Sequence, residues 1–317
     1  MRRRRIPGAK VCRDRSCTAI NAPHAPYTPR VWSGLLIFLA FSAAALAALT
    51  TAAIIFRAMH PPRHTLARAL ARRLPTDPGS VGVPFERADL VRDGDVRLTA
   101  WRCAAGSGAG TIVLIHGWGE SRFDRLPGLP FWHARSKEVL VVDRRGHGDS
   151  SGLAGVTESE ADDLQEWIRA APQPVIVIAW SQALVPALVS AARPESAVSA
   201  VILIGPPLRW SDALGRMLHD SGVPRYPCAP MAAAILRCLG WSGDRADELA
   251  ARCKCPVLVL RGSRDALVSA EEARAVALAA RAPYLEIDGA GHQEIEPHLG
   301  AEATAAIDAF VRSAAVR

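Results

Sequence analysis

The sequence predicts an α/β fold: a doubly wound, mainly parallel β-sheet with a small helical lid, preceded by one transmembrane helix. Three observations lead to this prediction. Short β-branched apolar segments alternate with helical segments along most of the chain, which is typical of a parallel sheet with helices on both faces. One interval interrupts that alternation and suggests the lid. A long uncharged segment lies ahead of the first strand.

Basic charge is concentrated in the N-terminal part of the chain. Residues 1–73 contain 13 of the 38 Lys and Arg residues but only one of the 31 acidic residues, Asp14. The rest of the chain is therefore slightly acidic, although the pI of the whole sequence is near 9.3. Binding of nucleic acid would require the basic charge to lie on the folded body. We expect no nucleic-acid partner.

The uncharged segment covers 31–56 and is bounded by two arginines. Its 26 residues exceed the ~20 that span a bilayer. We therefore predict a basic N-terminal segment at 1–30 and a transmembrane helix at 31–56. A cleaved signal peptide is the competing interpretation, although its apolar core usually has only ~7–15 residues. The basic residues nearest the segment favour a cytoplasmic C-terminal side, whereas the arginine run Arg2–Arg5 favours a cytoplasmic N-terminus. We expect a single-pass membrane protein and follow the arginine run in placing its body outside the cytoplasm, with the opposite orientation left open.

Residues 57–84 have the composition of a juxtamembrane linker. Pro61 and Pro62 end the preceding helix. A short basic amphipathic helix is expected at 64–74, where it suits either a lipid surface or solvent.

Strand patterns dominate from residue 85 onward, and we place one domain at 85–317. A turn at 93–95 joins the two strands of an antiparallel hairpin. Capping boxes at Thr157–Glu160 and Ser269–Glu272 indicate the starts of two helices. Six apolar segments predict the parallel strands, at 111–115, 138–142, 175–178, 200–204, 256–260 and 284–287.

The interval from about 208 to 255 does not follow the strand–helix alternation. It is rich in large apolar side chains and is interpreted as a small lid, although surface helices at the sheet edge explain the pattern equally well. The candidates to line a substrate pocket under a lid are Met217, Met231, Ile235, Leu236 and Trp241.

The apolar strand at 175–178 leads directly into the sequence A-W-S-Q-A, centred on Ser181. A serine at a sharp strand-to-helix turn presents its hydroxyl at the sheet edge, beside backbone N–H groups that can receive an oxyanion. Ala179 and Ala183 occupy positions where glycine is usual, and Pro186 removes a helix hydrogen bond soon afterwards. The turn therefore resembles G-x-S-x-G without matching it.

Loops with reactive side chains follow the other predicted strands. H-G-W-G-E begins at His116, and D-R-R-G-H-G-D-S begins at Asp143. Asp265 follows a later strand in R-G-S-R-D, and His292 follows the last strand in G-A-G-H. Because the carboxyl ends of parallel strands meet along one edge of the sheet, we expect these loops to converge on one crevice.

This set of side chains suits nucleophilic catalysis. A serine hydroxyl is a poor nucleophile until a base takes its proton, and histidine is the base whose pKa lies near neutrality. A carboxylate can orient the histidine and stabilise its charged form. Asp288 competes with Asp265 for this role, but it follows its own strand too closely to reach across.

From residue 85 on, the chain resembles an α/β-hydrolase-fold serine hydrolase of the esterase or lipase type. The resemblance rests on five motifs in the family's order: I-H-G-W-G, D-R-R-G-H-G-D-S, A-W-S-Q-A, R-G-S-R-D and G-A-G-H. It implies that Ser181 is the nucleophile, His292 the general base and then acid, and Asp265 the orienting carboxylate.

The same resemblance implies that the backbone N–H groups of Trp118 and Gln182 form the oxyanion hole, and that His116 and the 143–150 loop are structural. We therefore predict a membrane-anchored serine hydrolase that cleaves a small-molecule or lipid ester of a carboxylic acid through an acyl-enzyme intermediate. No metal or organic cofactor is expected. Two alternatives remain open: a peptidase or amidase of the same fold, and a catalytically degenerate binding protein displayed on a membrane.

Overall fold

The computed structural model describes residues 29–104, 108, 110–220, 222, 226–241 and 245–315. Most of the predicted basic segment at 1–30 therefore lies outside the described residues. The chain divides into two compact units, Met1–Leu46 and Ala47–Arg317. The division falls within the first helix, α1 (Pro29–Met59).

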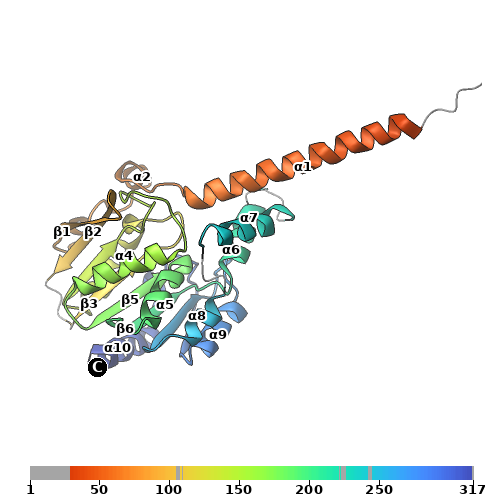
Figure 1. Ribbon diagram of the computed structural model, residues 1–317. Helices are drawn as coiled ribbons and strands as arrows, with labels where there is room; N and C mark the ends of the chain where they lie inside the picture. Colours follow the sequence, from red (N-terminus) through yellow and green to blue (C-terminus); the bar gives the residue numbers. More distant parts are fainter. Residues whose placement is uncertain are drawn as a thin grey trace, which may run out of the picture. The chain divides into compact units, whose positions relative to one another are not determined.

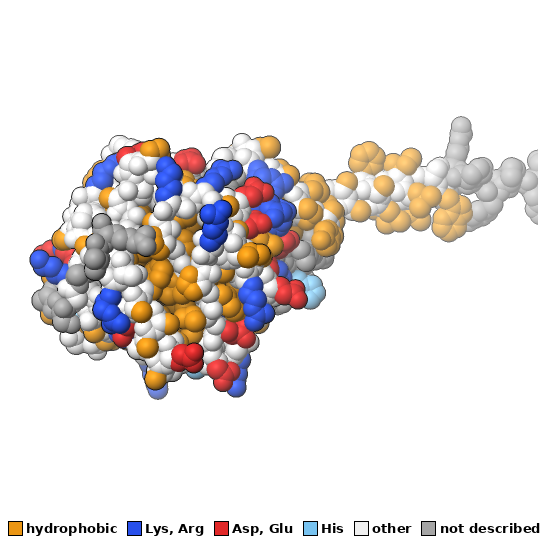
Figure 2. Space-filling view, turned by 90° about the horizontal axis from the view of Figure 1, so that it is seen from below, with side chains coloured by type: hydrophobic (Ala, Val, Ile, Leu, Met, Phe, Trp, Pro, Cys, Tyr) orange, Lys and Arg blue, Asp and Glu red, His pale blue; other side chains and the backbone are white. Residues whose placement is uncertain are grey.

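Helix α1 has the length and composition of a membrane span. An 18-residue window within Trp32–Met59 has a mean hydropathy of 2.2. The described side chains of its first unit, from Trp32 to Leu46, are exposed and uncharged, whereas Lys, Arg, Asp and Glu side chains are scattered over the body (Figure 2). An exposed helix that is apolar on all sides is unfavourable in water, so α1 is a candidate transmembrane helix. A signal sequence near the N-terminus can meet the same criterion of length and hydropathy.

An eight-stranded sheet forms the centre of the body, in the order β1-β2-β4-β3-β5-β6-β7-β8. The pairs β1–β2 and β2–β4 are antiparallel, and the remaining neighbours are parallel. The predicted hairpin and mainly parallel sheet are thus confirmed. The strands are β1 (Glu86–Arg92), β2 (Val96–Ala104), β3 (Thr111–Ile115), β4 (Glu138–Val142), β5 (Val175–Trp180), β6 (Val198–Ile204), β7 (Val257–Gly262) and β8 (Tyr284–Ile287).

Helices cover both faces of the sheet (Figure 1). Helices α4, α5, α8 and α9 pack on one face, and α3 and α10 pack on the other. The helices of the body are α2 (Leu66–Ala71), α3 (Leu129–His133), α4 (Glu158–Arg169), α5 (Leu184–Ala192), α6 (Trp210–Asp220), α7 (Cys228–Cys238), α8 (Ala246–Ala251), α9 (Ala270–Ala279) and α10 (Ala301–Ala315). Short 3₁₀ helices are η1 (Pro78–Val81), η2 (Arg122–Arg125), η3 (Ser181–Ala183) and η4 (Glu296–His298).

The strand order reverses at β3, because the chain adds β4 on one side of β3 and then β5 on the other. In open parallel sheets, ligands bind at the carboxyl ends of the strands that flank such a reversal. The loops after β3 and β5 contain Trp118 and Ser181 respectively. The topology therefore brings these two predicted site residues to the same edge.

Two helix starts test the predicted capping boxes. At the start of α9, Ser269 and Glu272 each accept the backbone N–H of the other, so this box is confirmed. The box predicted at the start of α4 is wrong, since Thr157 is the N-cap without a side-chain hydrogen bond. The Glu160 carboxylate accepts instead from Arg144 Nη2 at 2.6 Å, and a buried ion partner competes well with a backbone N–H.

The predicted lid interval contains α6, α7 and α8, which lie between β6 and β7 in the chain. The last turns of α1, from Ala47 onward, pack in the same unit as these helices. Ile54 forms a small buried cluster with Cys228 and Ala232 of α7. The end of α1 is thereby joined to the lid region.

Candidate active site

Ser181 lies at the junction of β5 and η3, directly before α5. Its φ of +52° is in the left-handed region, a conformation that a non-glycine residue keeps only where its surroundings impose it. Ala179 and Ala183 are fully buried, so their methyl groups fit beside the turn. Pro186 lies in the first turn of α5, where a backbone N–H has no partner within the helix. The sharp turn therefore forms with all three departures from the usual sequence.

Asp265 and His292 are in direct contact, with His292 Nδ1 and Asp265 Oδ2 2.7 Å apart. Because an ionised carboxylate only accepts hydrogen bonds, Nδ1 donates. The other oxygen of Asp265 accepts the backbone N–H groups of Leu267 and Val268, each at 2.9 Å. Burial opposes ionisation of Asp265, but these hydrogen bonds outweigh it and hold its pKa below the ordinary value.

Two further residues define the surroundings of this pair. Asp288, the competing acid, accepts instead from Ser263 Oγ at 3.1 Å. Gly205 follows β6 with a φ of +56°, and a Cβ there would be 3.0 Å from the His292 ring and 3.1 Å from Asp265. Glycine at this position leaves room for the histidine beside the acid.

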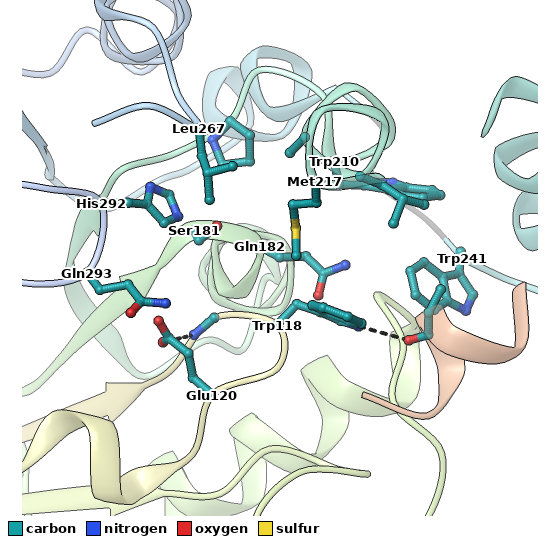
Figure 3. A pocket seen from close by; sticks show the side chains of 15 residues that line it. Trp118, Glu120, Ser181, Gln182, Trp210, Met217, Trp241, Leu267, His292 and Gln293 are labelled. Carbon is teal, nitrogen blue, oxygen red and sulfur yellow. Dashed lines mark hydrogen bonds between the residues drawn. The ribbon is translucent and has the colours of Figure 1, made fainter. Parts of the chain in front are cut away.

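One pocket brings together Ser181, His292, Trp118 and Gln182, the predicted nucleophile, base and oxyanion donors. Figure 3 shows the His292 ring pointing toward Ser181. The described part of the chain contains no hydrogen bond between them, and such bonds often shorten only when substrate binds. The pocket has a volume of about 80 Å³, enough for several water molecules.

Apolar side chains from separate elements line much of this pocket: Ala58 of α1, Trp210, Leu214 and Met217 of α6, and Trp241 and Leu267 from loops. Among the five candidates from the lid, Met217 and Trp241 line the pocket. The prediction is wrong for Met231 and Ile235, which are exposed, and for Leu236, which is buried in the core. These three fail because α7 packs Leu236 into the core and leaves the side with Met231 and Ile235 exposed.

The loop after β3 is held from two sides. Gly117 N–H donates to Glu120 Oε2 at 2.9 Å, and Trp118 Nε1 donates to the Ala58 carbonyl oxygen at 3.0 Å (Figure 3). A Cβ on Gly117 would lie only 3.2 Å from Ser181 Cβ, so glycine permits this close approach. The backbone N–H of Trp118 has no hydrogen-bond partner within the described residues and is available to a ligand.

Arg125 contacts three segments that surround the pocket: the loop after β3, the end of β5 and the loop that contains His292. Its side chain is 2% exposed, and Nη2 lies 3.3 Å from Glu120 Oε2. Its guanidinium carbon lies 4.4 Å from the centre of the Trp180 ring, and Nη1 donates to the Gln293 carbonyl oxygen at 3.4 Å. These three partners lie beside the oxyanion loop, the serine and the histidine respectively.

His116 and the 143–150 loop lie beneath the pocket. His116 Nδ1 donates to the Gly117 carbonyl at 2.8 Å, and Nε2 accepts the Arg144 N–H at 3.0 Å. Burial lowers the pKa of His116 well below its ordinary value and that of His147 to about 3. Both ring nitrogens of His116 are thus engaged in holding loops, in agreement with a structural role.

Comparison with known proteins places these features in a family. A sequence model described as the alpha/beta hydrolase family matches residues 112–307, which is more than half of the chain. The chain belongs to the alpha/beta hydrolase family. No protein with a curated description matches it in sequence.

Solved structures share the fold of this alpha/beta hydrolase at low sequence identity. An esterase from Pyrococcus furiosus is 20% identical with a TM-score of 0.63, over 80% of this chain and 97% of its own. An esterase from Rhodococcus sp. is 18% identical with a TM-score of 0.53, over 72% and 98%. A membrane phospholipase A, described as a bacterial virulence factor, is 18% identical with a TM-score of 0.56, over 90% and 99%.

The predicted resemblance is therefore confirmed at the level of fold and family. Four residues around the site of this alpha/beta hydrolase were not predicted from the sequence: Ala58, Glu120, Arg125 and Gly205. The sequence does contain a signal for Gly205, because a glycine directly after a buried strand often marks a place where another group approaches the backbone closely.

Proposed function

We propose that this alpha/beta hydrolase is a serine hydrolase that cleaves a carboxylic ester through an acyl-enzyme intermediate. The observation that carries the proposal is the 2.7 Å contact between His292 and Asp265. It lies beside a pocket that also contains Ser181, which is held at a positive φ. This arrangement supplies a nucleophile, a base and a group that orients the base.

In the proposed acylation, Ser181 Oγ attacks the ester carbonyl carbon and its proton passes to His292 Nε2. Asp265 accepts from Nδ1 and stabilises the imidazolium that forms. The carbonyl oxygen becomes an oxyanion that accepts the backbone N–H groups of Trp118 and Gln182. One such donor is typically worth about 10²–10³ in rate.

The tetrahedral intermediate then collapses, the bond to the alcohol oxygen breaks, and the alcohol leaves with the proton from His292. Deacylation repeats these steps with water. His292 removes a proton from the water as it attacks the acyl carbon, and Ser181 leaves with that proton when the acid is released.

The charges in the pocket favour an ester over a peptide with a free amino terminus. A carboxylate without another cationic partner would be the strongest binding group for such an ammonium group. Glu120 is the acidic residue that lines the pocket, and it already accepts the Gly117 N–H and faces the Arg125 guanidinium. The pocket therefore offers no spare negative charge among its described lining residues, whereas its apolar wall suits an acyl chain.

We also propose that α1 anchors the enzyme to a membrane in a single pass, with the body outside the cytoplasm. Support comes from the uncharged segment of 26 residues at 31–56, which lies within α1, and from the arginine run Arg2–Arg5. One structural neighbour is a membrane phospholipase A, and its match covers 90% of this chain. A lipid ester is a substrate consistent with such an anchor.

The test is reaction of the full-length protein with a fluorophosphonate probe, together with turnover of p-nitrophenyl butyrate. We expect labelling and turnover in the wild type and in Ser313→Ala, a control on the surface of α10, and loss of both in Ser181→Ala. Absence of labelling in the wild type would identify a binding protein instead. Faster cleavage of aminoacyl amides than of esters would identify a peptidase.

A further inference from the structure

Helix α7 exposes an apolar face. Its eleven residues, C-A-P-M-A-A-A-I-L-R-C, include one charged residue, Arg237. On the exposed side, Met231, Ile235 and Leu239 recur at intervals of four residues and so lie along one stripe. We call these three residues the α7 face. A helix that is apolar on both sides normally has a partner on both sides.

The side of α7 next to this face packs against the end of α1. Ile54 is 3% exposed in a cluster with Cys228 and Ala232, and Cys228 Sγ lies 3.7 Å from the Ala47 carbonyl oxygen. Helix α7 thus lies beside residues 47–54 of α1. Those residues belong to the uncharged segment, which continues to Phe56.

The length of that segment indicates the surroundings of α7. Its 26 residues measure about 39 Å as a helix, so they extend beyond a hydrocarbon core of about 30 Å by roughly six residues. The part beside α7 is its C-terminal third. On α1 itself, Leu49 and Phe56 remain exposed in this part. With α1 spanning a bilayer as proposed above, a helix that contacts these residues would lie where the hydrocarbon meets the head groups.

The substrate pocket begins one helical turn further along α1. Ala58, four residues after Ile54, lines the pocket. Leu214 of α6 packs against the Ile54 cluster and also lines the pocket. The contact between α1 and α7 and the wall of the pocket are therefore parts of one continuous apolar structure.

We propose that the α7 face lies in the interfacial layer of the bilayer that holds α1, and that the pocket receives the acyl chain of a lipid ester from this layer. The second half of this statement rests on the proposed ester hydrolysis. A phospholipid bilayer fits as the partner because it offers an apolar surface to the face at the level where α7 joins the uncharged helix.

Fluorescence quenching tests the position of the α7 face. Cys238 is an exposed native cysteine at the end of α7. An environment-sensitive fluorophore is attached to it in the full-length protein in phosphatidylcholine vesicles, after conversion of Cys12, Cys17, Cys253 and Cys255 to serine. The control carries the label at Leu278→Cys on α9, where Leu278 is 81% exposed, with Cys238→Ser.

We expect lipids with a doxyl group near the top of the acyl chain to quench the label at Cys238 at least about threefold more than the label at position 278. Equal quenching at the two positions would overturn the proposal. So would shielding of Cys238 that rises with the number of proteins per vesicle, because a second copy of the chain would then cover the face. Quenching requires no turnover, so this result is independent of the proposed ester hydrolysis, although it rests on the proposed membrane anchor.

Activity measurements test the route of the substrate. Ile235→Glu and Met231→Glu place a charge in the α7 face, and Leu278→Glu is the matched control. We expect both α7 variants to hydrolyse an ester embedded in vesicles roughly tenfold more slowly, while all variants cleave p-nitrophenyl acetate at wild-type rates. Equal rates on the embedded ester would overturn entry from the membrane. A wild type that is inactive on both esters would instead reject the proposed ester hydrolysis.

Discussion

At the scale of single residues, the proposed chemistry depends on how firmly the acid holds the histidine. Asp265 accepts from His292 and from two backbone amides, so its position is determined on both oxygens. We expect Asp265→Asn to retain the fold and to lower kcat by about 10³–10⁴, because the amide cannot hold the required tautomer of the ring. Turnover of p-nitrophenyl butyrate and thermal unfolding measure the two effects.

Asp288→Asn is the control for this prediction, since Asp288 bonds to Ser263 and lies on the neighbouring loop. It should keep most of its activity. The opposite result, an inactive Asp288→Asn beside a nearly normal Asp265→Asn, would transfer the role of the acid to Asp288.

Arg125 holds the site without lining its pocket. Its contacts reach the oxyanion loop, the serine strand and the histidine loop, so its loss should misplace reacting groups without changing the pocket wall. A shift of about 1 Å can cost roughly 10² in rate. We expect Arg125→Met to lower kcat by about 10–100-fold with KM nearly unchanged, and Arg125→Lys to recover part of the loss.

The control is Arg122→Met, three residues earlier in η2. Arg122 is similarly buried, pairs with Asp143 at 2.7 Å and stacks 4.4 Å over the Trp101 ring, away from the pocket. Both variants should lose stability, but only Arg125→Met should lose kcat among correctly folded molecules. Equal changes in kcat in Arg125→Met and Arg122→Met would show that Arg125 stabilises the fold without a specific role in positioning the site.

At the scale of elements, the end of α1 serves as part of the pocket. Ala58 lines the pocket, and its carbonyl accepts from the Trp118 ring on the oxyanion loop. Deleting residues 1–46 should leave kcat/KM for a soluble ester nearly unchanged. Deleting residues 1–84 should lower it at least about fivefold, because a buried hydrogen bond and its apolar surroundings are lost. Active-site titration of both purified proteins gives kcat/KM per folded molecule, and full activity of the shorter protein would show that the end of α1 is dispensable.

At the scale of the whole molecule, buried histidines make stability depend on pH. Burial lowers the pKa of His147 from 6.5 to about 3. Between pH 6.5 and pH 3, His147 therefore binds a proton in the unfolded chain but not in the folded chain. The free energy of unfolding decreases progressively as the pH falls through this range. Burial of Asp143, whose pKa rises to about 6, acts in the opposite direction below that pH.

We expect the melting temperature of the wild type to fall more steeply between pH 6.5 and pH 5 than that of His147→Gln, which has no ring to protonate. Thermal unfolding at intervals of half a pH unit measures both slopes. Parallel curves would mean that His147 makes no contribution to the acid sensitivity.

The sequence by itself determined the strands, the sharp turn at Ser181 and the order of the candidate site residues. Burial on both faces of a parallel strand requires a β-branched apolar segment, and a strand-to-helix turn requires small residues around the serine. Both requirements are local and can be recognised in a few consecutive letters. A capping box is also local, yet the one at Thr157 failed because a distant arginine competed for Glu160.

Only the tertiary structure decided which distant residues meet. Arg125 contacts positions 120 and 293 on two loops and position 180 at the end of β5, and the strand order brings these three positions together. Ala58 lines the pocket because the end of α1 packs against the lid helices. The way α7 packs in the same region leaves Met231 and Ile235 exposed. The spacing of apolar residues predicts that a helix has an apolar face, but it does not predict which segment packs against that face. That choice depends on the packing of the whole chain.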